Sequence, residues 1–157
     1  MPRAETDIRV ATTPEELAAV HAIRREVFIV EQEVPEDEEW DDLDATAEHL
    51  LVLGGDGTPL GTARLIHGDR ALTVTGRSGA VLLGRLAVRK AARGTGLGAD
   101  LVRAIEAAGL ARGATELELH AQVAALGFYE RLGYTAHGPE YLDGGIPHRT
   151  MTRSLAG

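Results

Sequence analysis

The chain has 157 residues, no cysteine and a net charge of −8. This length fits one domain of about 100–200 residues. Aromatic residues make up only 4% of the chain, so aliphatic side chains must fill its core. The absence of cysteine excludes disulfides, thiolate metal sites and cysteine nucleophiles. The first residues are too polar for a signal peptide, and no apolar run approaches the about 20 residues that span a bilayer. We therefore expect a cytoplasmic protein with no membrane partner.

The charge is unevenly distributed along the chain. Residues 31–48 contain ten acidic side chains and no lysine or arginine, whereas the remaining 14 acids face 16 basic residues. A slightly basic body without a clustered basic face argues against a nucleic-acid partner. The acidic segment, residues 31–48, predicts either a solvated loop or a surface that attracts a cationic ligand.

Periodicity and turn signals predict a mixed α/β domain over residues 1–157. The expected strands cover residues 7–12, 49–53, 60–67, 81–88, 117–120, a segment from 134 to 137, and 147–153. The expected helices cover residues 14–25, capped by Thr13, about 96–112 and 123–132. Residues 27–30 fit neither pattern, and residues 31–46 predict an irregular loop with room for a helical turn. Residues 70–77 predict either an extension of the preceding hairpin or a loop.

A glycine-rich turn lies between a predicted strand and a predicted helix. Its residues are Arg93, Gly94, Thr95, Gly96, Leu97, Gly98 and Ala99. Glycines there allow a ligand to approach the backbone, and free N–H groups with the helix dipole attract an anion such as phosphate. A plain strand-to-helix turn is the alternative that needs no ligand.

Two nucleotide-binding motifs fit this turn poorly. A Walker A loop needs Lys and Ser or Thr after its last glycine, but Ala99 and Asp100 follow here. The dinucleotide fingerprint matches Gly94, Gly96 and Ala99 formally. However, its first glycine should follow the strand directly, and the motif lies too late in the chain to leave room for a second nucleotide-binding half.

Three segments in the right order resemble the GNAT superfamily of N-acetyltransferases. They are Leu86-Ala87-Val88, the turn RGTGLG from Arg93, and residues 127–134 (GFYERLGY). A narrower resemblance, to the ElaA-like acetyltransferases, covers nearly the whole chain. It rests on residues 25–32 (REVFIVEQ), the acidic run up to His49, and Gly145-Ile146-Pro147-His148 with Met151.

The resemblance implies a central, mostly antiparallel sheet that splays at its fourth and fifth strands and is flanked by helices. It also implies direct transfer of the acetyl group of acetyl-CoA to a primary amine of a small molecule or peptide, without a metal. In that scheme Arg93 and the amides of residues 94–99 bind the pyrophosphate. The edge of Leu86, Ala87 and Val88 pairs with pantetheine and polarises the thioester carbonyl. Tyr129 protonates the departing thiolate, or it only packs against the short helix.

The proton acceptor for the amine is less well determined by sequence. Glu31 has the best local context, and its rivals are Asp41, Asp44, His49, His120 and His148. Asp44 and His148 are also candidates for contacts with the substrate, which we expect to be cationic. A non-catalytic acyl-CoA-binding or sensor module on the same fold is the alternative function. A homodimer is left open. The chain has no Gly-x-Ser-x-Gly elbow and no pair of histidines at metal-ligand spacing, so hydrolase and metal-site functions are not expected.

Overall fold

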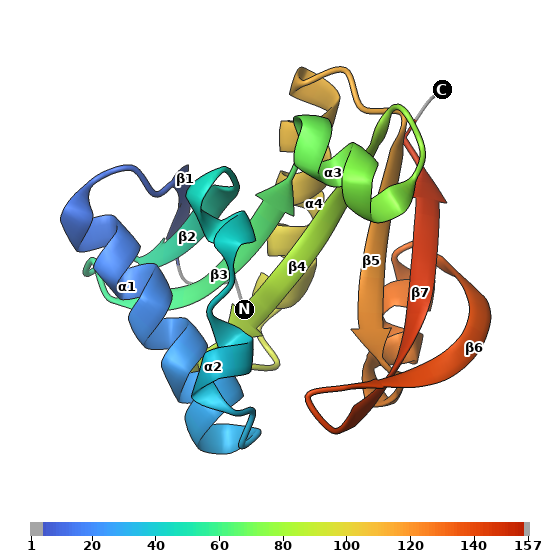
Figure 1. Cartoon of the computed structure of the whole chain (residues 1–157). Coiled ribbons are helices and arrows are strands. Elements are labelled where there is room, and N and C mark those ends of the chain that lie inside the picture. Colours follow the sequence, from blue (N-terminus) through green and yellow to red (C-terminus); the bar gives the residue numbers. More distant parts are fainter. Residues whose placement is uncertain (1–4, 156–157) are drawn as a thin grey trace.

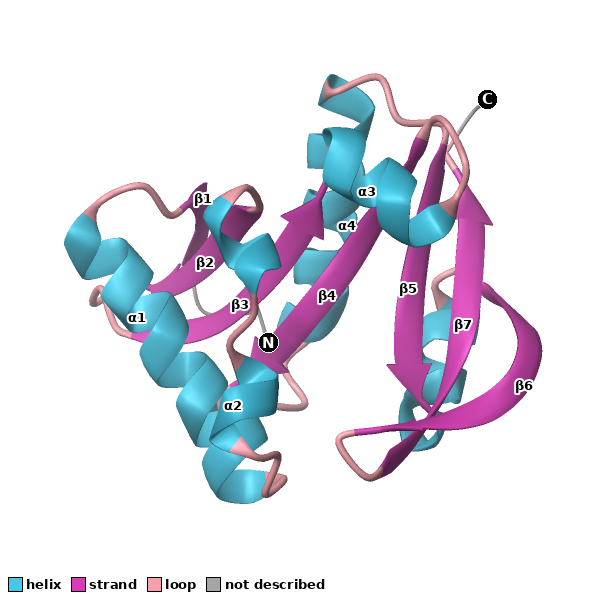
Figure 2. Cartoon of the chain, viewed as in Figure 1, coloured by secondary structure: helices cyan, strands magenta, loops and turns pink. Residues whose placement is uncertain are grey.

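The computed structural model describes residues 5–155 and shows a mixed α/β fold built on one seven-stranded sheet (Figures 1 and 2). The strands are β1 (Thr6–Val10), β2 (Glu48–Gly54), β3 (Pro59–Ile66), β4 (Ala80–Val88), β5 (Glu116–Gln122), β6 (Thr135–Asp143) and β7 (Ile146–Ser154). The α-helices are α1 (Pro14–Arg24), α2 (Glu36–Glu39), α3 (Gly68–Thr75), α4 (Leu97–Ala111) and α5 (Leu126–Arg131). A π-helix, η1 (Arg25–Glu31), and three 3₁₀ turns, η2 (Asp42–Ala45), η3 (Lys90–Ala92) and η4 (Val123–Ala125), complete the chain.

The strands follow the order β1-β2-β3-β4-β5-β7-β6, and β4 and β5 form the parallel pair of an otherwise antiparallel sheet. That parallel pairing joins Ala80–Leu83 to Glu116–Leu119 and goes no further. Beyond Leu83, β4 continues to pair with β3 but has no partner on the side of β5. The predicted splay between the fourth and fifth strands is therefore confirmed, and Figure 1 shows the two strands diverging toward their C-terminal ends.

A β-bulge in β4 accompanies the separation of the strands. Thr62 of β3 pairs with Ala87, and Arg64 pairs with Gly84, so Arg85 and one further residue of β4 stand opposite a single residue of β3. Arg85 has a φ of 51°, a left-handed conformation that costs a non-glycine residue about 1–2 kcal/mol. Because a bulge bends its strand and increases the local twist, it turns the end of β4 away from β5.

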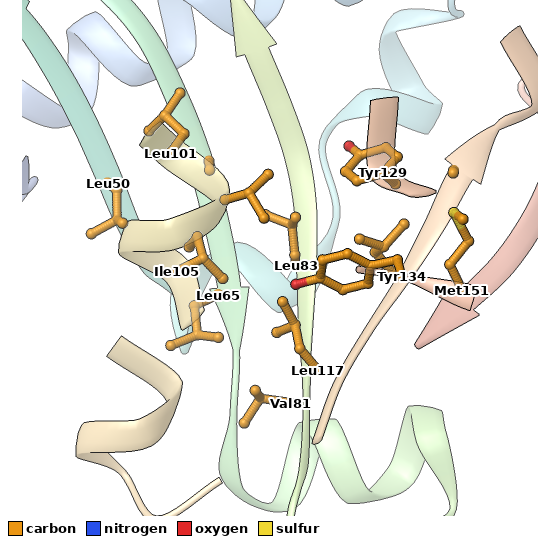
Figure 3. Packing of buried hydrophobic residues seen from close by; sticks show 14 of the residues in the cluster. Leu50, Leu65, Val81, Leu83, Leu101, Ile105, Leu117, Tyr129, Tyr134 and Met151 are labelled. Atoms are coloured by element: carbon orange, nitrogen blue, oxygen red, sulfur yellow. The ribbon is translucent and has the colours of Figure 1, made fainter. Parts of the chain in front are cut away.

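Helices cover both faces of the sheet. On one face, α4 buries Leu101 and Ile105 completely against β3 and β4, and the same cluster includes Tyr129 and Tyr134 (Figure 3). On the other face lie α1 and α3, which pack against β3 and β4. Helix α1 begins with a capping box in which Glu16 accepts from the backbone N–H groups of residues 12 and 13, which lowers the pKa of Glu16 to about 2.

Two segments differ from the sequence-based predictions. Residues 70–77, expected as a strand extension or loop, instead belong mostly to α3, which buries Ala71 against Ile66 and Leu82. Its β-branched Thr73, Val74 and Thr75 have low helix propensity, and tertiary packing overrides it. Residues 27–30, which fitted no pattern, lie in the π-helix η1 that continues α1 without a break. None of the helices in residues 5–155 is both long and apolar enough to cross a bilayer.

Candidate active site

A cavity of about 630 Å³ lies where β4 and β5 separate. Residues 84–88 of β4 and 119–122 of β5 line it, together with Tyr129 and Phe128 of α5. The π-helix η1, the acidic segment and the turn between β6 and β7 complete the walls. The fold therefore brings residues 86–88, the GFYERLGY segment and the acidic segment together at one cavity.

Inside the cavity, the edge of β4 has no partner strand. The carbonyl of Ala87 faces β3, where it would lie 3.0 Å from a Cβ on Gly61. Because hydrogen-bonding direction alternates along a strand, Leu86 and Val88 turn their N–H and C=O groups toward the open side. The Val88 carbonyl there accepts a hydrogen bond from Nε of Arg93 at 2.9 Å.

The glycine-rich turn leads directly into α4. Gly94 and Gly96 have φ values of 79° and 89°, a region that favours glycine. A Cβ built on Gly94 would meet no atom within 4 Å, so the backbone is exposed there. Gly96 is the N-cap of α4 and provides no side-chain cap for the first-turn N–H groups. These features fit an anionic group such as a pyrophosphate, which would meet the N–H groups of the first turn of a helix.

The other residues of the turn have different surroundings. The side chain of Leu97 is buried in the core, so it can offer a ligand only its backbone. Thr95 directs its hydroxyl to the carbonyl of Ala92 at 2.5 Å and so braces the turn. A Cβ on Gly98 would lie 3.3 Å from the ring of Phe128, which explains the third glycine by packing.

Arg93 links the turn to the opposite wall of the cavity. Besides the carbonyl of Val88, its guanidinium contacts Glu31, with Nη2 and Oε1 separated by 2.8 Å. That Glu31 is the base stays a prediction of the sequence, since in the structure this carboxylate holds the arginine of the turn.

Tyr129 lines the cavity and also belongs to the core. Its side chain is 8% exposed, and its ring makes edge contacts with Phe128 at 4.9 Å and Tyr134 at 6.1 Å between centroids. Burial raises the pKa of the Tyr129 hydroxyl, which therefore stays protonated at neutral pH. The packing role and the position beside the cavity coexist.

Most acids of the acidic segment are held in ion pairs, and attraction of a cationic ligand stays a prediction. Seven of its ten acids form ion pairs with arginines: Glu31, Glu36, Glu39, Asp41, Asp42, Asp44 and Glu48. Of these, Glu39 pairs with the fully buried Arg24 over 2.8 Å, and Arg85 reaches the same carboxylate over 3.1 Å. The network attaches the segment to β3, β4 and α1.

Asp44 belongs to this network and does not line the cavity. Burial alone would raise the pKa of its carboxyl, but Arg24 and Arg64, each 2.8 Å away, more than offset that effect and lower the pKa to about 2. Its predicted contact with a substrate remains a prediction. Glu38 does line the cavity, and among the described residues no cation lies within ion-pair distance of it.

The histidines named from sequence separate into two groups. His49 is buried outside the cavity, where its Nε2 lies 3.0 Å from the carbonyl oxygen of Asp44. His120 and His148 both line the cavity. Nδ1 of His148 donates to the carbonyl of Ile146 at 2.7 Å, and its ring stacks on Tyr141.

Several cavity residues were missed by sequence reasoning. Gln122 of β5 donates to Gln32 across 2.8 Å, joining residues 90 positions apart. Arg85 lines the cavity from the bulge, and burial lowers the pKa of its guanidinium. Gln32 lies inside a segment of family resemblance, residues 25–32, whereas no signal in the sequence marked Gln122. Within residues 5–155, no group of three or more histidine, aspartate or glutamate side chains is placed to hold a metal ion, and metal-free chemistry remains a prediction.

Comparison with known proteins agrees with this geometry. An acetyltransferase (GNAT) domain model matches residues 10–155. The uncharacterized N-acetyltransferase YjcF of Bacillus subtilis is 36% identical over 92% of this chain and 96% of its own length. An acyl-CoA N-acyltransferase structure from Pseudomonas aeruginosa gives a TM-score of 0.78 at 34% identity, covering 96% and 99% of the two chains. The Escherichia coli ElaA structure also gives 0.78, at 26% identity over 96% and 99%.

Proposed function

Because the chain belongs to the GNAT family of acetyltransferases, we propose that it moves the acetyl group of acetyl-CoA to a primary amine of a small molecule or peptide. The observation that carries this proposal is the cavity at the splay of β4 and β5. It brings together an open strand edge, Arg93 of the glycine-rich turn and a buried tyrosine hydroxyl. Each of these features suits one part of the reaction.

The turn and the strand edge would bind the acyl donor. The first amides of α4 and the guanidinium of Arg93 would hold the pyrophosphate, since both attract anions. The open edge of Leu86 and Val88 would pair with the peptide-like pantetheine arm in the manner of an added strand. A backbone N–H on this edge would polarise the thioester carbonyl and stabilise the negative charge that develops on its oxygen.

Bound acetyl-CoA supplies a thioester: the neutral amine nitrogen bonds to the carbonyl carbon, the C–S bond breaks, and one proton of that nitrogen ends on sulfur. Tyr129 would assist by donating a hydrogen bond to the departing sulfur. An ordinary thiol has a pKa of about 8.5, below that of the buried phenol, so complete proton transfer from Tyr129 is uphill. We therefore assign the hydroxyl a hydrogen-bonding role toward the developing thiolate.

The acceptor would be cationic before it reacts. Most of the acidic segment is neutralised by arginines, so attraction would depend mainly on Glu38 and Asp143, which line the cavity. Among the described residues neither has a cation within ion-pair distance, and their fields act over about 8–10 Å at physiological salt. The expected preference for a cationic substrate therefore depends on the carboxylates of Glu38 and Asp143.

A panel of cationic, neutral and anionic primary amines, followed by thiol release and product mass, tests the proposal. We expect acetylation of cationic amines, weakened by Glu38→Gln and by added salt. Asp37→Asn is the matched control, because Asp37 is exposed in the same segment and does not line the cavity. Tight acetyl-CoA binding without transfer to any amine would contradict the proposal and favour a non-catalytic acyl-CoA-binding module.

A further inference from the structure

We propose that the Glu118–His120 pair of β5 removes the proton from the acceptor amine, with His120 as the proton acceptor and Glu118 as its positioning residue. This inference rests on the proposed acetyl transfer. It identifies the base that deprotonates the amine, for which the sequence left several candidates. It follows from the position of His120 in the sheet and from its contacts.

His120 lies at the fork of the splayed strands. The last residue pair between β4 and β5 joins Leu83 to Leu119, so His120 is the first residue of β5 without a partner on β4. It lines the cavity at that point. An amine that attacks a thioester held along the open edge of β4 from the side of β5 would meet His120 at this fork.

The side chain of His120 faces away from the predicted donor side of the sheet. Leu119 and Ala121 are each 2% exposed and pack in the same cluster as Tyr129 and α4. Successive strand residues point to opposite faces, so His120 lies on the face that carries α1 and α3. His120 and Tyr129 therefore reach one cavity from opposite faces of the sheet, as a proton acceptor for the amine and a partner for the sulfur should.

The contacts of His120 fix its tautomer. Nε2 lies 2.8 Å from Oε2 of Glu118, whose other oxygen accepts from Nη2 of Arg77 at 2.8 Å. The Glu118 side chain is 7% exposed, and an ionised carboxylate can only accept hydrogen bonds. Nε2 therefore carries hydrogen, and Nδ1 keeps the lone pair that can take a proton. The side chain of His120 itself is 36% exposed, which leaves it accessible.

The surrounding charges favour His120 over the other histidine of the cavity. Glu118 directly stabilises the imidazolium that forms when His120 accepts a proton, and Arg77 on the far side of Glu118 keeps that carboxylate in place. His148 donates to a neutral backbone carbonyl, and no carboxylate within residues 5–155 forms an ion pair with it. Tyr141 contacts both rings, with centroids 6.1 Å from His120 and 6.0 Å from His148, and burial raises its pKa so that it remains a neutral neighbour.

The charged groups of the cavity complete this environment. Besides the two histidines, the charged side chains that line it are Glu31, Glu38, Glu39, Asp41, Arg64, Arg85, Arg93 and Asp143. In the proposed step Nδ1 of His120 accepts one proton from the ammonium group, which frees the nitrogen lone pair for attack. The imidazolium then returns that proton to water, so the histidine ends each cycle neutral.

The test compares His120→Gln, Glu118→Gln and a control, His137→Gln, in the full chain. His137 is exposed on β6, contacts Thr152 through Nε2 at 2.8 Å and does not line the cavity. For each protein, kcat/KM toward a cationic amine is measured from about pH 6 to about pH 10, a range that reaches the titration of alkylamines. Acetyl-CoA affinity by calorimetry reports whether each variant is folded and binds the donor.

We expect His120→Gln to lose about 10²–10⁴-fold in kcat/KM near neutral pH, the usual contribution of general base catalysis. Its deficit should shrink toward about tenfold near pH 10, where the amine is increasingly neutral without help. The variant should also lose the acid limb of the wild-type profile. Glu118→Gln should lose about tenfold to hundredfold, whereas His137→Gln should match the wild type and all folded variants should keep their acetyl-CoA affinity.

Two results would overturn the assignment in distinguishable ways. If the wild type acetylates amines and His120→Gln matches it at every pH, or falls equally at every pH, His120 is not the proton acceptor and only this inference fails. If the wild type binds acetyl-CoA but acetylates no amine, the proposed function fails, and the role proposed for the Glu118–His120 pair fails with it. His120 is accessible, so its variant decides the outcome even if Glu118→Gln does not fold.

Discussion

Arg93 of the glycine-rich turn and Glu31 at the end of η1 are separated by 62 positions in the chain, yet Nη2 and Oε1 lie 2.8 Å apart. This ion pair connects the predicted phosphate-binding turn with η1 on the opposite wall of the cavity. In the free protein Glu31 therefore competes with any anionic ligand for the guanidinium of Arg93. The pair offers a direct way to separate donor binding from catalysis.

Arg93→Gln should weaken acetyl-CoA binding by about tenfold to hundredfold, because a hydrogen bond to a charged group contributes about 1.5–3 kcal/mol. Glu31→Gln should strengthen binding a few-fold, since it frees the arginine, and should leave single-turnover acetylation within a few-fold of the wild type. Calorimetry and rapid quench measure the two quantities. A loss of acetylation of more than about 10²-fold in Glu31→Gln would instead support the base role predicted from sequence.

Gly94 and Gly113 form a matched pair for testing the turn. Their φ values are 79° and 82°, and a Cβ on either would meet nothing within 4 Å. Alanine at each should cost about 1–2 kcal/mol of unfolding free energy, the penalty for the left-handed conformation. Only Gly94→Ala should also weaken acetyl-CoA binding, by at least about tenfold, because its Cβ would keep a pyrophosphate from the backbone. Equal affinities in the two variants would place the anion site elsewhere.

Tyr129→Phe should lower the single-turnover rate by about tenfold to hundredfold while sparing acetyl-CoA affinity, since it removes a hydrogen bond to developing negative charge. The ring remains, so the thermal midpoint should change little. Tyr134→Phe provides the contrast, because its hydroxyl donates to the buried Glu106 over 2.8 Å. That variant should lose about 1–3 kcal/mol of stability and keep its rate. A loss of stability in Tyr129→Phe together with a loss of rate in Tyr134→Phe would assign the catalytic role to Tyr134 and the structural role to Tyr129.

Acid stability should report the ion pairs of Asp44. The pKa of its carboxyl falls from an ordinary 3.8 to about 2 in the folded protein. A depressed folded-state pKa contributes stability above the unfolded pKa, here about 2 kcal/mol, which is lost as pH falls from about 4 to about 2. Urea titrations at several pH values should show this decline in the wild type and a smaller one in Asp44→Asn.

The Asp44→Asn variant should also lose about 3 kcal/mol at neutral pH, because it leaves the charges of Arg24 and Arg64 partly uncompensated in the interior. Asp42→Asn is the control, since Asp42 is 85% exposed and pairs with the surface residue Arg70. Its loss should stay below about 1 kcal/mol. Similar losses in the two variants would mean that the network adds little beyond surface pairing.

Local sequence signals predicted the features that depend on neighbouring residues. Thr13 and Pro14 marked the start of α1, and Gly94 and Gly96 marked the turn before α4, because capping and backbone freedom are properties of a few adjacent positions. The splay of β4 and β5 came only from the resemblance to a family. Propensity failed for α3, whose β-branched residues are held in a helix by the burial of Ala71.

The candidate site was less predictable, because it depends on contacts between distant segments. Nothing near Glu39 in the sequence shows that Arg24 and Arg85 neutralise it, so the acidic segment looked freer than it is. Likewise, the Glu118 and His120 spacing fits any strand, and only the register with β4 shows that His120 lies at the fork. The sequence showed where the acidic residues lie, but only the structure shows which of them are paired with arginines.

The short parallel pairing of β4 and β5 divides the sheet into two wings. Strands β1 to β4 form one wing and β5 to β7 the other, and the seam between them is the pairing of Ala80–Leu83 with Glu116–Leu119. A molecule bound in the cavity would contact residues of both β4 and β5, and would so link the two wings beyond the end of this pairing. The angle between the wings would then limit the width of a molecule that the cavity accepts, and we expect substitutions at the seam to alter the selectivity of the proposed reaction without contacting a ligand.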